Sequence, residues 1–422
     1  MFLRSFKLFL AALLTALLLV ACGNGEPAAA PTGLAVSPGE SSATITWDVK
    51  DGVEYWLFFG PTTYAPSSTS TMQAWFGLPG GNVILKVTSP YVVTGLPNDL
   101  SYSFSLNGRT NGGPGGPGAT PVAATARLAG ATWSAGTTIG SGGDLRSLTW
   151  ATLTSADGLL SSTKYVAAGA AGALHTSSDG VSWSAINSAT SSNFNGAAYF
   201  GSFKLVGDGG VILLSSDAVT WNAQNSGTTQ NLYAIASNGL NLNVAVGANG
   251  TIITSADGTT WTPATSTATS RDLYAVNYST YNGGTWMAAG AGGTMVKSTD
   301  GLTWSAVASG SSVDLRGISY GITSLTSGTG TYVVVGAAGT VLSSADGATW
   351  TAQTLSSTSA LNAVLMGSQL VAIGNAGAIF TSTDGLLWTP QVTGTSKDLY
   401  AIARGNLSYL AVGAAGSNLL TR

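Results

Sequence analysis

The sequence holds few of the residues that enzymes use for chemistry. Its 422 residues include one histidine and one cysteine, and Asp, Glu, Lys and Arg together make up 8%. His175, with no second histidine or cysteine near it in the sequence, supplies too few ligands for a zinc site. No Ser–His–Asp set is recognisable. We therefore expect no metal and no cofactor, and we assign His175 to packing or the surface.

Glutamate is absent from most of the chain. All three glutamates, Glu26, Glu40 and Glu54, lie in the first 54 residues. A glycosidase needs two carboxylates about 5 to 9.5 Å apart. Most later aspartates fall at the repeated positions described below, and the residual pair, Asp157 and Asp208, lies in different turns. We therefore predict a protein that is not an enzyme. Paired aspartates across a channel are the open alternative.

Basic residues are scarce as well. The sequence has 15 Lys and Arg and 18 Asp and Glu, which gives a net charge of -3. Without a basic patch, a nucleic-acid partner is not expected. Glycine is frequent at 57 residues, yet Trp, Tyr, Phe and aliphatic residues recur regularly. The composition therefore indicates a folded all-β protein and not low-complexity disorder.

The N-terminus has the pattern of an export signal. Arg4 and Lys7 precede Leu8–Val20, an apolar run of 13 residues broken only by Thr15. The run is too short for a permanent membrane span and suits a signal peptide. It ends in Leu19-Val20-Ala21-Cys22-Gly23, which resembles the lipobox of bacterial lipoproteins. An ordinary signal peptide or an uncleaved anchor is the alternative.

The lipobox resemblance implies a location. Residues 1–21 would be removed and Cys22 acylated, so that no cysteine remains for a disulfide. Two or three acyl chains suffice for stable anchoring in a membrane. Gly23 in place of Asp resembles the outer-membrane sorting pattern of Gram-negative bacteria. We expect a lipid-anchored protein of the cell envelope, at the outer membrane or cell surface in such a host. Residues 22–30 are predicted to form a tether.

Residues 31–127 have the pattern of a β-sandwich. Seven short strands are predicted at Leu34–Val36, Ala43–Trp47, Glu54–Phe59, Val83–Thr88, Tyr91–Thr94, Ser101–Leu106 and Val122–Ala126. The positions of Trp47, Leu96 and Tyr102 resemble those of the fibronectin type III family. Pro97 and Leu100 depart from the pattern of that family. The resemblance implies a spacer domain.

From residue 128 the sequence is one repeat. Tryptophans recur at intervals of 38 to 50 residues, at Trp133, Trp183, Trp221, Trp261, Trp304, Trp350 and Trp388. The last six each follow a turn containing an aspartate: Asp179, Asp217, Asp257, Asp300, Asp346 and Asp384. Asp-Gly favours a two-residue hairpin in which both central residues have positive φ. Each unit therefore reads as four short antiparallel strands, which is typical of a β-propeller blade.

The two ends of the repeat complement each other. The last unit, Leu399–Arg422, stops after Leu419-Leu420 without a turn or a tryptophan, and Ala131–Trp133 supplies the missing strand. We predict a seven-bladed propeller over residues 128–422, closed by this pairing. Its turns resemble the Asp-box (BNR) repeat of sialidases and of photosystem II stability/assembly factor-like propellers. That resemblance implies a structural role for the six aspartates.

Each unit also opens with a recurring polar motif. Ten or eleven residues after each tryptophan the chain reads Asp-Leu-Arg, Asn-Leu-Tyr or a variant, at the predicted mouth of the central channel. The candidate ligand-binding residues are Asp144, Arg146, Asn231, Tyr233, Asp272, Tyr274, Asp314, Arg316, Asp398 and Tyr400. The alternative is structural: Asp and Asn start the strand through bonds to the backbone, and the aromatics fill between blades.

Insertions break the repeat on the other side. They fall between the first and second strands, at Trp150–Lys164, Tyr278–Thr285 and Ile322–Thr331, on the face of the Asp turns. Tyr278, Tyr281 and Trp286 place aromatics there, where a partner could bind. We predict a binding or scaffold lipoprotein whose propeller holds a protein or a glycan. The alternative is a carbohydrate-active propeller, either a lectin or a divergent sialidase-like glycoside hydrolase.

Overall fold

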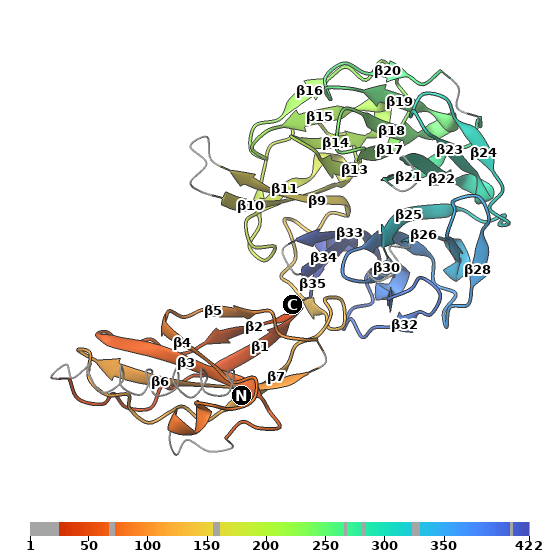
Figure 1. Cartoon of the computed structure of the whole chain (residues 1–422). Coiled ribbons are helices and arrows are strands. Elements are labelled where there is room, and N and C mark those ends of the chain that lie inside the picture. The colour runs from red at the N-terminus through yellow and green to blue at the C-terminus, as the bar shows by residue number, and fades with distance from the viewer. Residues whose placement is uncertain are drawn as a thin grey trace. The chain divides into compact units, whose positions relative to one another are not determined.

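A computed structural model describes residues 25–66, 72–98, 100–154, 161–265, 268–280, 284–322, 330–405 and 408–421. The chain divides into two compact units, one reaching Leu128 and one spanning Ala129–Thr421 (Figure 1). Cys22 with the predicted signal peptide, Asp157 and Tyr281 lie outside the described residues. Within those ranges, no helix is long and apolar enough to cross a membrane.

The first unit consists of two antiparallel sheets around one core. One sheet has the order β1-β2-β5 and the other β4-β3-β6-β7. The strands are β1 (Ala35–Gly39), β2 (Ser42–Thr46), β3 (Val53–Pro61), β4 (Asn82–Val87), β5 (Tyr91–Thr94), β6 (Ser101–Thr110) and β7 (Val122–Thr125), with a short helix η1 (Met72–Trp75). Ile45, Leu57 and Phe104 are fully buried between the sheets, and Trp47 packs beside them. All seven strands predicted from alternation are present.

The segment before β1 packs on the first unit. Pro27 forms a β-bridge with Arg109, and the Thr110 hydroxyl donates to the Glu26 carbonyl at 2.5 Å. Ala28 is buried. A side chain at Gly116 would overlap the Ala28 carbonyl, so the glycine-rich loop after β6 leaves the room that this segment occupies. Residues 26–28 are therefore held against the first unit.

The second unit contains seven four-stranded antiparallel sheets arranged around a centre, a seven-bladed β-propeller (Figure 1). The first four blades are β9–β12 (Leu145–Thr154, Ser161–Gly169, Leu174–Ser177, Ser184–Ala185), β13–β16 (Phe194–Tyr199, Phe203–Gly207, Ile212–Ser215, Asn222–Gln224), β17–β20 (Leu232–Ser237, Asn243–Gly247, Ile252–Ser255, Thr262–Pro263) and β21–β24 (Leu273–Ser279, Thr285–Gly290, Met295–Ser298, Ser305–Val307). The remaining three are β25–β28 (Leu315–Ile322, Gly330–Gly336, Val341–Ser344, Thr351–Gln353), β29–β32 (Leu361–Met366, Leu370–Gly374, Ile379–Ser382, Thr389–Pro390) and β33–β35 (Leu399–Gly405, Ser408–Gly413, Asn418–Leu420) with β8 (Ser134–Ala135).

A glycine-flanked turn joins the second and third strands of every blade. These 3-10 turns are η2 (Ala170–Gly172), η3 (Asp208–Gly210), η4 (Ala248–Gly250), η6 (Ala291–Gly293), η7 (Ala337–Gly339), η8 (Asn375–Gly377) and η9 (Ala414–Gly416). In the third blade a side chain at Gly247 would overlap the Asn231 carbonyl, and Gly250 has φ +70°. Only glycine fits both positions, which accounts for the repeated Gly-x-x-Gly.

The ring closes with a different strand from the one predicted. Ser134 and Ala135, not Ala131–Trp133, pair with Leu420 and Leu419. Residues 129–133 instead form the turn of this blade, because the Trp133 indole donates to the Gly130 carbonyl at 2.9 Å. The Gly130 amide donates to the Thr421 hydroxyl at 3.0 Å, the bond that a serine accepts in the other blades. The seventh turn is thus built from both ends of the unit, with Ala129 in the place of the aspartate.

The six Asp turns are loops and not two-residue hairpins. In the first of them the residue after the aspartate, Gly180, has φ +74°, whereas Asp179 has no positive φ. One carboxylate oxygen of Asp179 accepts the amides of Val181 and Ser182, both at 2.8 Å, and the hydroxyl of Ser177 at 2.9 Å. The other five aspartates accept the equivalent three bonds. The prediction of positive φ at both residues was wrong, because the carboxylate organises a longer loop.

Candidate ligand-binding ring in the propeller channel

A β-bulge opens the innermost strand of every blade. In the third blade Leu232 pairs with Gly247 and Ala234 with Val246, so that Tyr233 has no partner across the strand. The same shift leaves one residue unpaired in each of the other blades. These seven residues, the channel ring, are Arg146, Asn195, Tyr233, Tyr274, Arg316, Asn362 and Tyr400. Bulges re-aim side chains and are common beside functional sites.

The channel ring lines two cavities in the described part of the propeller. A cavity of about 360 Å³ is lined by the seven ring residues and Asp314. A second cavity of about 210 Å³ shares the ring residues and continues along the innermost strands past Ile235, Val276 and Ile318. Pockets that hold small ligands have volumes of about 300–1,000 Å³. The larger cavity therefore has room for one or two side chains or a small molecule.

The aspartates and asparagines that precede each strand serve another purpose. The carboxylate of Asp272 accepts a hydrogen bond from the backbone amide of Asn249 at 2.9 Å. Asn249 is the positive-φ residue in the 3-10 turn of the preceding blade. Equivalent bonds run from Ala171 to Asn193, Gly209 to Asn231, Gly292 to Asp314, Ala376 to Asp398 and Ala415 to Asp144. These side chains join neighbouring blades, which is a structural role. Of this set Asp314 alone also lines the larger cavity.

The ring carries the same triplet twice. Neighbouring blades follow chain order around the ring, giving Arg146, Asn195 and Tyr233, then Tyr274, then Arg316, Asn362 and Tyr400. The two asparagines are held alike. The side-chain amide of Asn195 donates to the Asp208 carboxylate at 2.8 Å and to the Leu232 carbonyl at 3.1 Å. The Asn362 amide donates to Asn375 at 2.7 Å and to the Leu399 carbonyl at 2.9 Å.

The arginines and tyrosines of the ring are available as donors. The Arg316 guanidinium donates to the Asn362 side-chain oxygen at 3.1 Å. Arg146 is exposed, and its guanidinium forms no hydrogen bond within the described part of the chain. The rings of Tyr233 and Tyr274 lie 5.5 Å apart, tilted by 58°. The guanidinium groups of Arg146 and Arg316 therefore line the channel from separate blades. Each arginine is followed around the ring by an asparagine and then a tyrosine.

The surroundings of the three phenols raise their pKa values above the ordinary value. Burial raises the pKa of Tyr233, and the Asp272 carboxylate raises it further. Burial and Asp314 act in the same way on the pKa of Tyr274, and burial and Asp144 on that of Tyr400. A tyrosine is already neutral near pH 7, and the raised pKa values keep each phenol a hydrogen-bond donor to higher pH, suited to an acceptor on a ligand.

The structure divides the ten predicted ligand residues into two sets. Five of them, the arginines and tyrosines, belong to the channel ring. The other five, Asp144, Asn231, Asp272, Asp314 and Asp398, join blades. Asn195 and Asn362 were not among the ten, although they occupy the position of the tyrosines in the same motif. The bulges show that the third residue of all seven motifs lines the channel.

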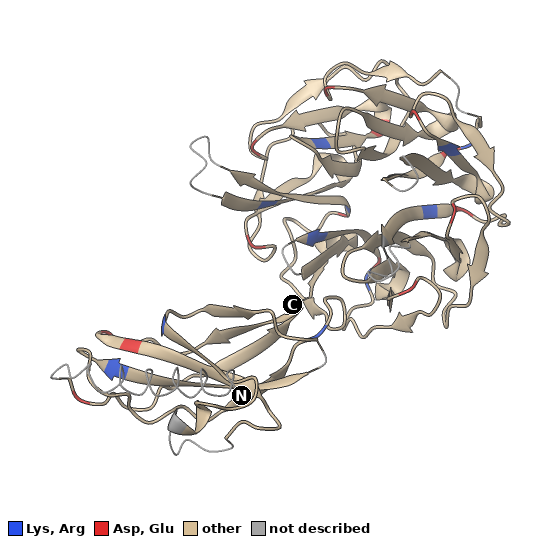
Figure 2. Cartoon of the chain, viewed as in Figure 1, with Lys and Arg blue, Asp and Glu red and all other residues tan. Residues whose placement is uncertain are grey.

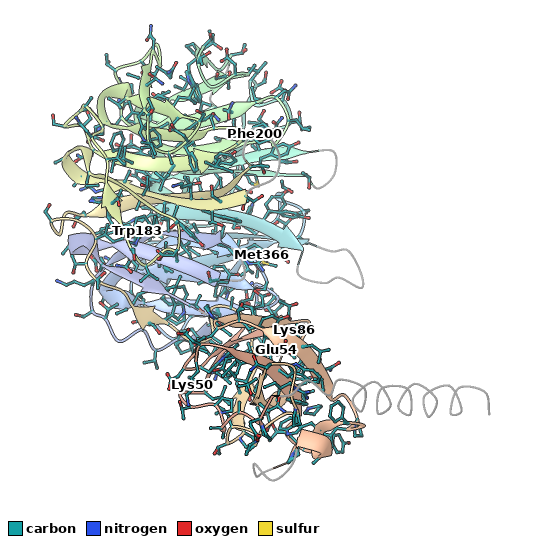
Figure 3. The ribbon with its side chains drawn as sticks, turned by 90° about the vertical axis from the view of Figure 1, so that its left-hand side faces the viewer. Lys50, Glu54, Lys86, Trp183, Phe200 and Met366 are labelled. Atoms are coloured by element: carbon teal, nitrogen blue, oxygen red, sulfur yellow. The ribbon has the colours of Figure 1, made fainter. Side chains whose placement is uncertain are left out.

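The face carrying the Asp turns differs from the prediction. Trp286 is 1% exposed, and its ring lies 4.8 Å from that of Tyr278 within the core between two blades. The expectation that Trp286 belongs to a partner surface was therefore wrong, because β21 and β22 extend as a paired hairpin that turns Trp286 inward. Exposed apolar residues on this face are instead Leu240 and Leu387, both 78% exposed, and Phe200 (Figure 3).

The described ranges contain no cluster of metal ligands. No three His, Cys, Asp or Glu side chains there could hold a metal ion together. His175 is 8% exposed, within the first blade. Figure 2 shows how thinly charge is spread over the chain. The arrangement suits the binding of a ligand by donors and aromatic faces.

Solved structures share the propeller fold. YCF48 bound to D1 peptide is 17% identical, with a TM-score of 0.55, over 68% of this chain and 94% of that chain. YCF48 from Cyanidioschyzon merolae is 16% identical, with a TM-score of 0.52, over 69% and 99%. The WD40 beta propeller domain of Doa1 is 10% identical, with a TM-score of 0.53, over 69% and 97%. No protein-family model and no curated protein matches the sequence.

Proposed function

We propose that this chain is a binding protein whose channel ring holds a peptide segment of a partner protein. The observation that carries the proposal is the set of seven bulges, which direct Arg146, Arg316 and three tyrosines into the channel. The donors favour a segment that carries a carboxylate, which an arginine binds through paired hydrogen bonds. No catalytic step is part of this proposal.

The likeness to YCF48 supports a peptide as the ligand. One solved structure of that propeller holds a D1 peptide. At 17% identity the likeness concerns the fold, so the ligand of this chain rests on the ring residues themselves. The small volume of the larger cavity, about 360 Å³, agrees with one or two side chains of a peptide entering the channel.

We further propose that the protein is a lipoprotein of the cell envelope, anchored through Cys22. The lipobox pattern supports the anchor. The strand order β1-β2-β5 against β4-β3-β6-β7 and the buried Trp47 support a fibronectin type III-like spacer in the first unit. Labelling with a palmitate analogue tests the anchor, because label that persists in Cys22→Ser would contradict it.

Peptide display tests the ring. Peptides selected from a random library on the Cys22→Ser protein should carry acidic residues or a required free C-terminus. Arg146→Gln or Arg316→Gln should weaken their binding about ten-fold or more, since a hydrogen bond to a charged group contributes about 1.5–3 kcal/mol. Arg271→Gln is the matched control, because Arg271 is exposed and lies outside the ring. Equal loss in the control would refute the proposal.

A carbohydrate ligand is the second candidate. The tilted pair Tyr233 and Tyr274 offers aromatic faces on which a sugar ring can stack. Binding on a glycan array that disappears in Tyr274→Ala, without binding of any selected peptide, would favour a lectin. Turnover of sialosides or xyloglucan, abolished by Asp272→Asn or Asp314→Asn, would favour a hydrolase and overturn the proposal of a protein without catalysis.

A further inference from the structure

The chain enters the first unit at one end of its larger sheet. A side chain at Gly25 would overlap the Thr110 carbonyl and lie 3.2 Å from the side chain of Asn111. Thr110 is the last residue of β6 and pairs with Val53, the first residue of β3. The Val53 amide donates to the Lys50 carbonyl at 3.3 Å. Gly25, the turn after Thr110 and the turn before Val53 therefore share one end of the unit.

The chain between this end and Cys22 is short. From Glu26 onward the segment is held by the bonds to Thr110 and Arg109. Two residues, Gly23 and Asn24, separate Cys22 from Gly25. The three Cα–Cα steps from Cys22 to Gly25 span at most about 11 Å, whatever the conformation. If Cys22 is acylated and lies at the membrane surface, Gly25 therefore lies within about 11 Å of Cys22 and so close to that surface.

We propose that this end of the first unit, formed by the turns at residues 48–52 and 110–112, lies against the lipid headgroups. The proposal rests on the proposed acylation of Cys22. Val49 is 63% exposed. It is followed by Lys50, which is also exposed and is labelled in Figure 3. An aliphatic side chain next to a lysine suits the membrane interface, because the aliphatic group enters the apolar boundary and the ammonium reaches the phosphates.

The opposite end of the same strand provides the comparison. β3 runs nine residues from Val53 to Pro61, about 26 Å along an extended strand. The Tyr64 amide donates to the Pro61 carbonyl at 3.0 Å, and Tyr64 is 54% exposed. Tyr64 therefore marks an exposed site on the same rigid sheet, far from the point of attachment.

Fluorescence quenching on vesicles tests the proposal. The full acylated chain carries no other cysteine, so Val49→Cys and Tyr64→Cys can each be labelled at one site with a small fluorophore. In vesicles containing nitroxide-labelled lipids, the Val49 probe should be quenched at least about two-fold more than the Tyr64 probe, because of their separation along β3. A flexible insert of twenty Gly and Ser residues after Gly23 should abolish that difference.

The outcomes separate the two proposals. Protein that fails to float with the vesicles would refute the lipid anchor, and this proposal with it. Protein that floats but shows equal or reversed quenching of the two probes would refute the orientation alone. Preferential quenching at Val49 that survives the long insert would also overturn the proposal, since the short connection would not be its cause.

Discussion

One position in the propeller lacks a bond that its six equivalents make. Before the innermost strand of the sixth blade stands Ala360, where the other blades have Asp or Asn. The amide of Ala338, in the 3-10 turn of the preceding blade, therefore lacks the side-chain acceptor that the equivalent amides have. Ala338 has φ +55°, close to the +55° of Asn249, whose amide is bonded to Asp272. The turn is thus already in the geometry that the bond requires.

We predict that Ala360→Asn stabilises the propeller. A net hydrogen bond contributes about 0.5–1.5 kcal/mol, and exposure of the turn places this one at about 0.5–1 kcal/mol. Domains of 150–250 residues shift by about 2–4 °C per kcal/mol, and a unit as large as Ala129–Thr421 shifts less, so we expect a rise of about 1–2 °C. Asn231→Ala, which removes the same bond to Gly209, should lower stability by a similar amount.

Denaturant unfolding measures the predicted change in stability, and hydrogen exchange tests whether the new hydrogen bond to the Ala338 amide forms. The midpoint of denaturant unfolding should move up in Ala360→Asn and down in Asn231→Ala, with unchanged slopes. Exchange of the Ala338 amide should slow in Ala360→Asn, because the new side chain accepts its hydrogen. An unchanged exchange rate at Ala338 would show that the bond does not form. Faster exchange together with a lower midpoint would refute the assignment of these side chains as links between blades.

Three further predictions concern stability. Thr421→Val should lower the free energy of unfolding by about 1–3 kcal/mol, because the amide of Gly130 loses its buried acceptor. Denaturant unfolding measures this free energy, and an unchanged value would contradict a closure built from both ends of the unit. Burial lowers the pKa of His175 in the folded chain, so His175 binds a proton at higher pH in the unfolded chain than in the folded one. The free energy of unfolding should therefore fall as pH drops below about 6.5. A His175→Gln protein with the same dependence of stability on pH would contradict this. Burial lowers the pKa of Lys204 to about 8, and its ammonium donates to the carbonyls of Phe200 and Ser202. Between pH 8 and about 10.5 the unfolded chain holds the extra proton, so stability should rise with pH by up to about 3 kcal/mol relative to Lys204→Met, and parallel pH curves for the two proteins would refute the shift.

Much of the fold could be predicted from local pattern. The recurring tryptophans and aspartates marked each blade, because every four-stranded unit repeats the same loop and the same core contact. Alternation of apolar residues located the strands of the first unit, since one face of each strand is buried. The loop geometry was less accessible. Asp179 organises its loop through bonds to residues two and three positions later, and an Asp-Gly pair does not distinguish such a loop from a two-residue hairpin.

The candidate site was predictable only in part. The motif Asp-Leu-Arg or Asn-Leu-Tyr pointed to the channel, but it treated the first and third residues alike. In the structure the first residue joins neighbouring blades and the third faces the channel. The distinction depends on the bulge at the third residue and on the turn of another blade, some 22 residues earlier for Asp314 and 271 residues later for Asp144.

The sequence by itself determined the repeat, the number of blades and the scarcity of catalytic groups, because these depend on residue type and spacing. Tertiary structure alone decided which groups meet: the Thr421 hydroxyl with the Gly130 amide, the Asp144 carboxylate with the last 3-10 turn, and seven unpaired residues around one channel. The physical reason is that a bulge, a closure and a contact between blades depend on pairing between distant strands. A local pattern of apolar and polar residues carries no information on that pairing.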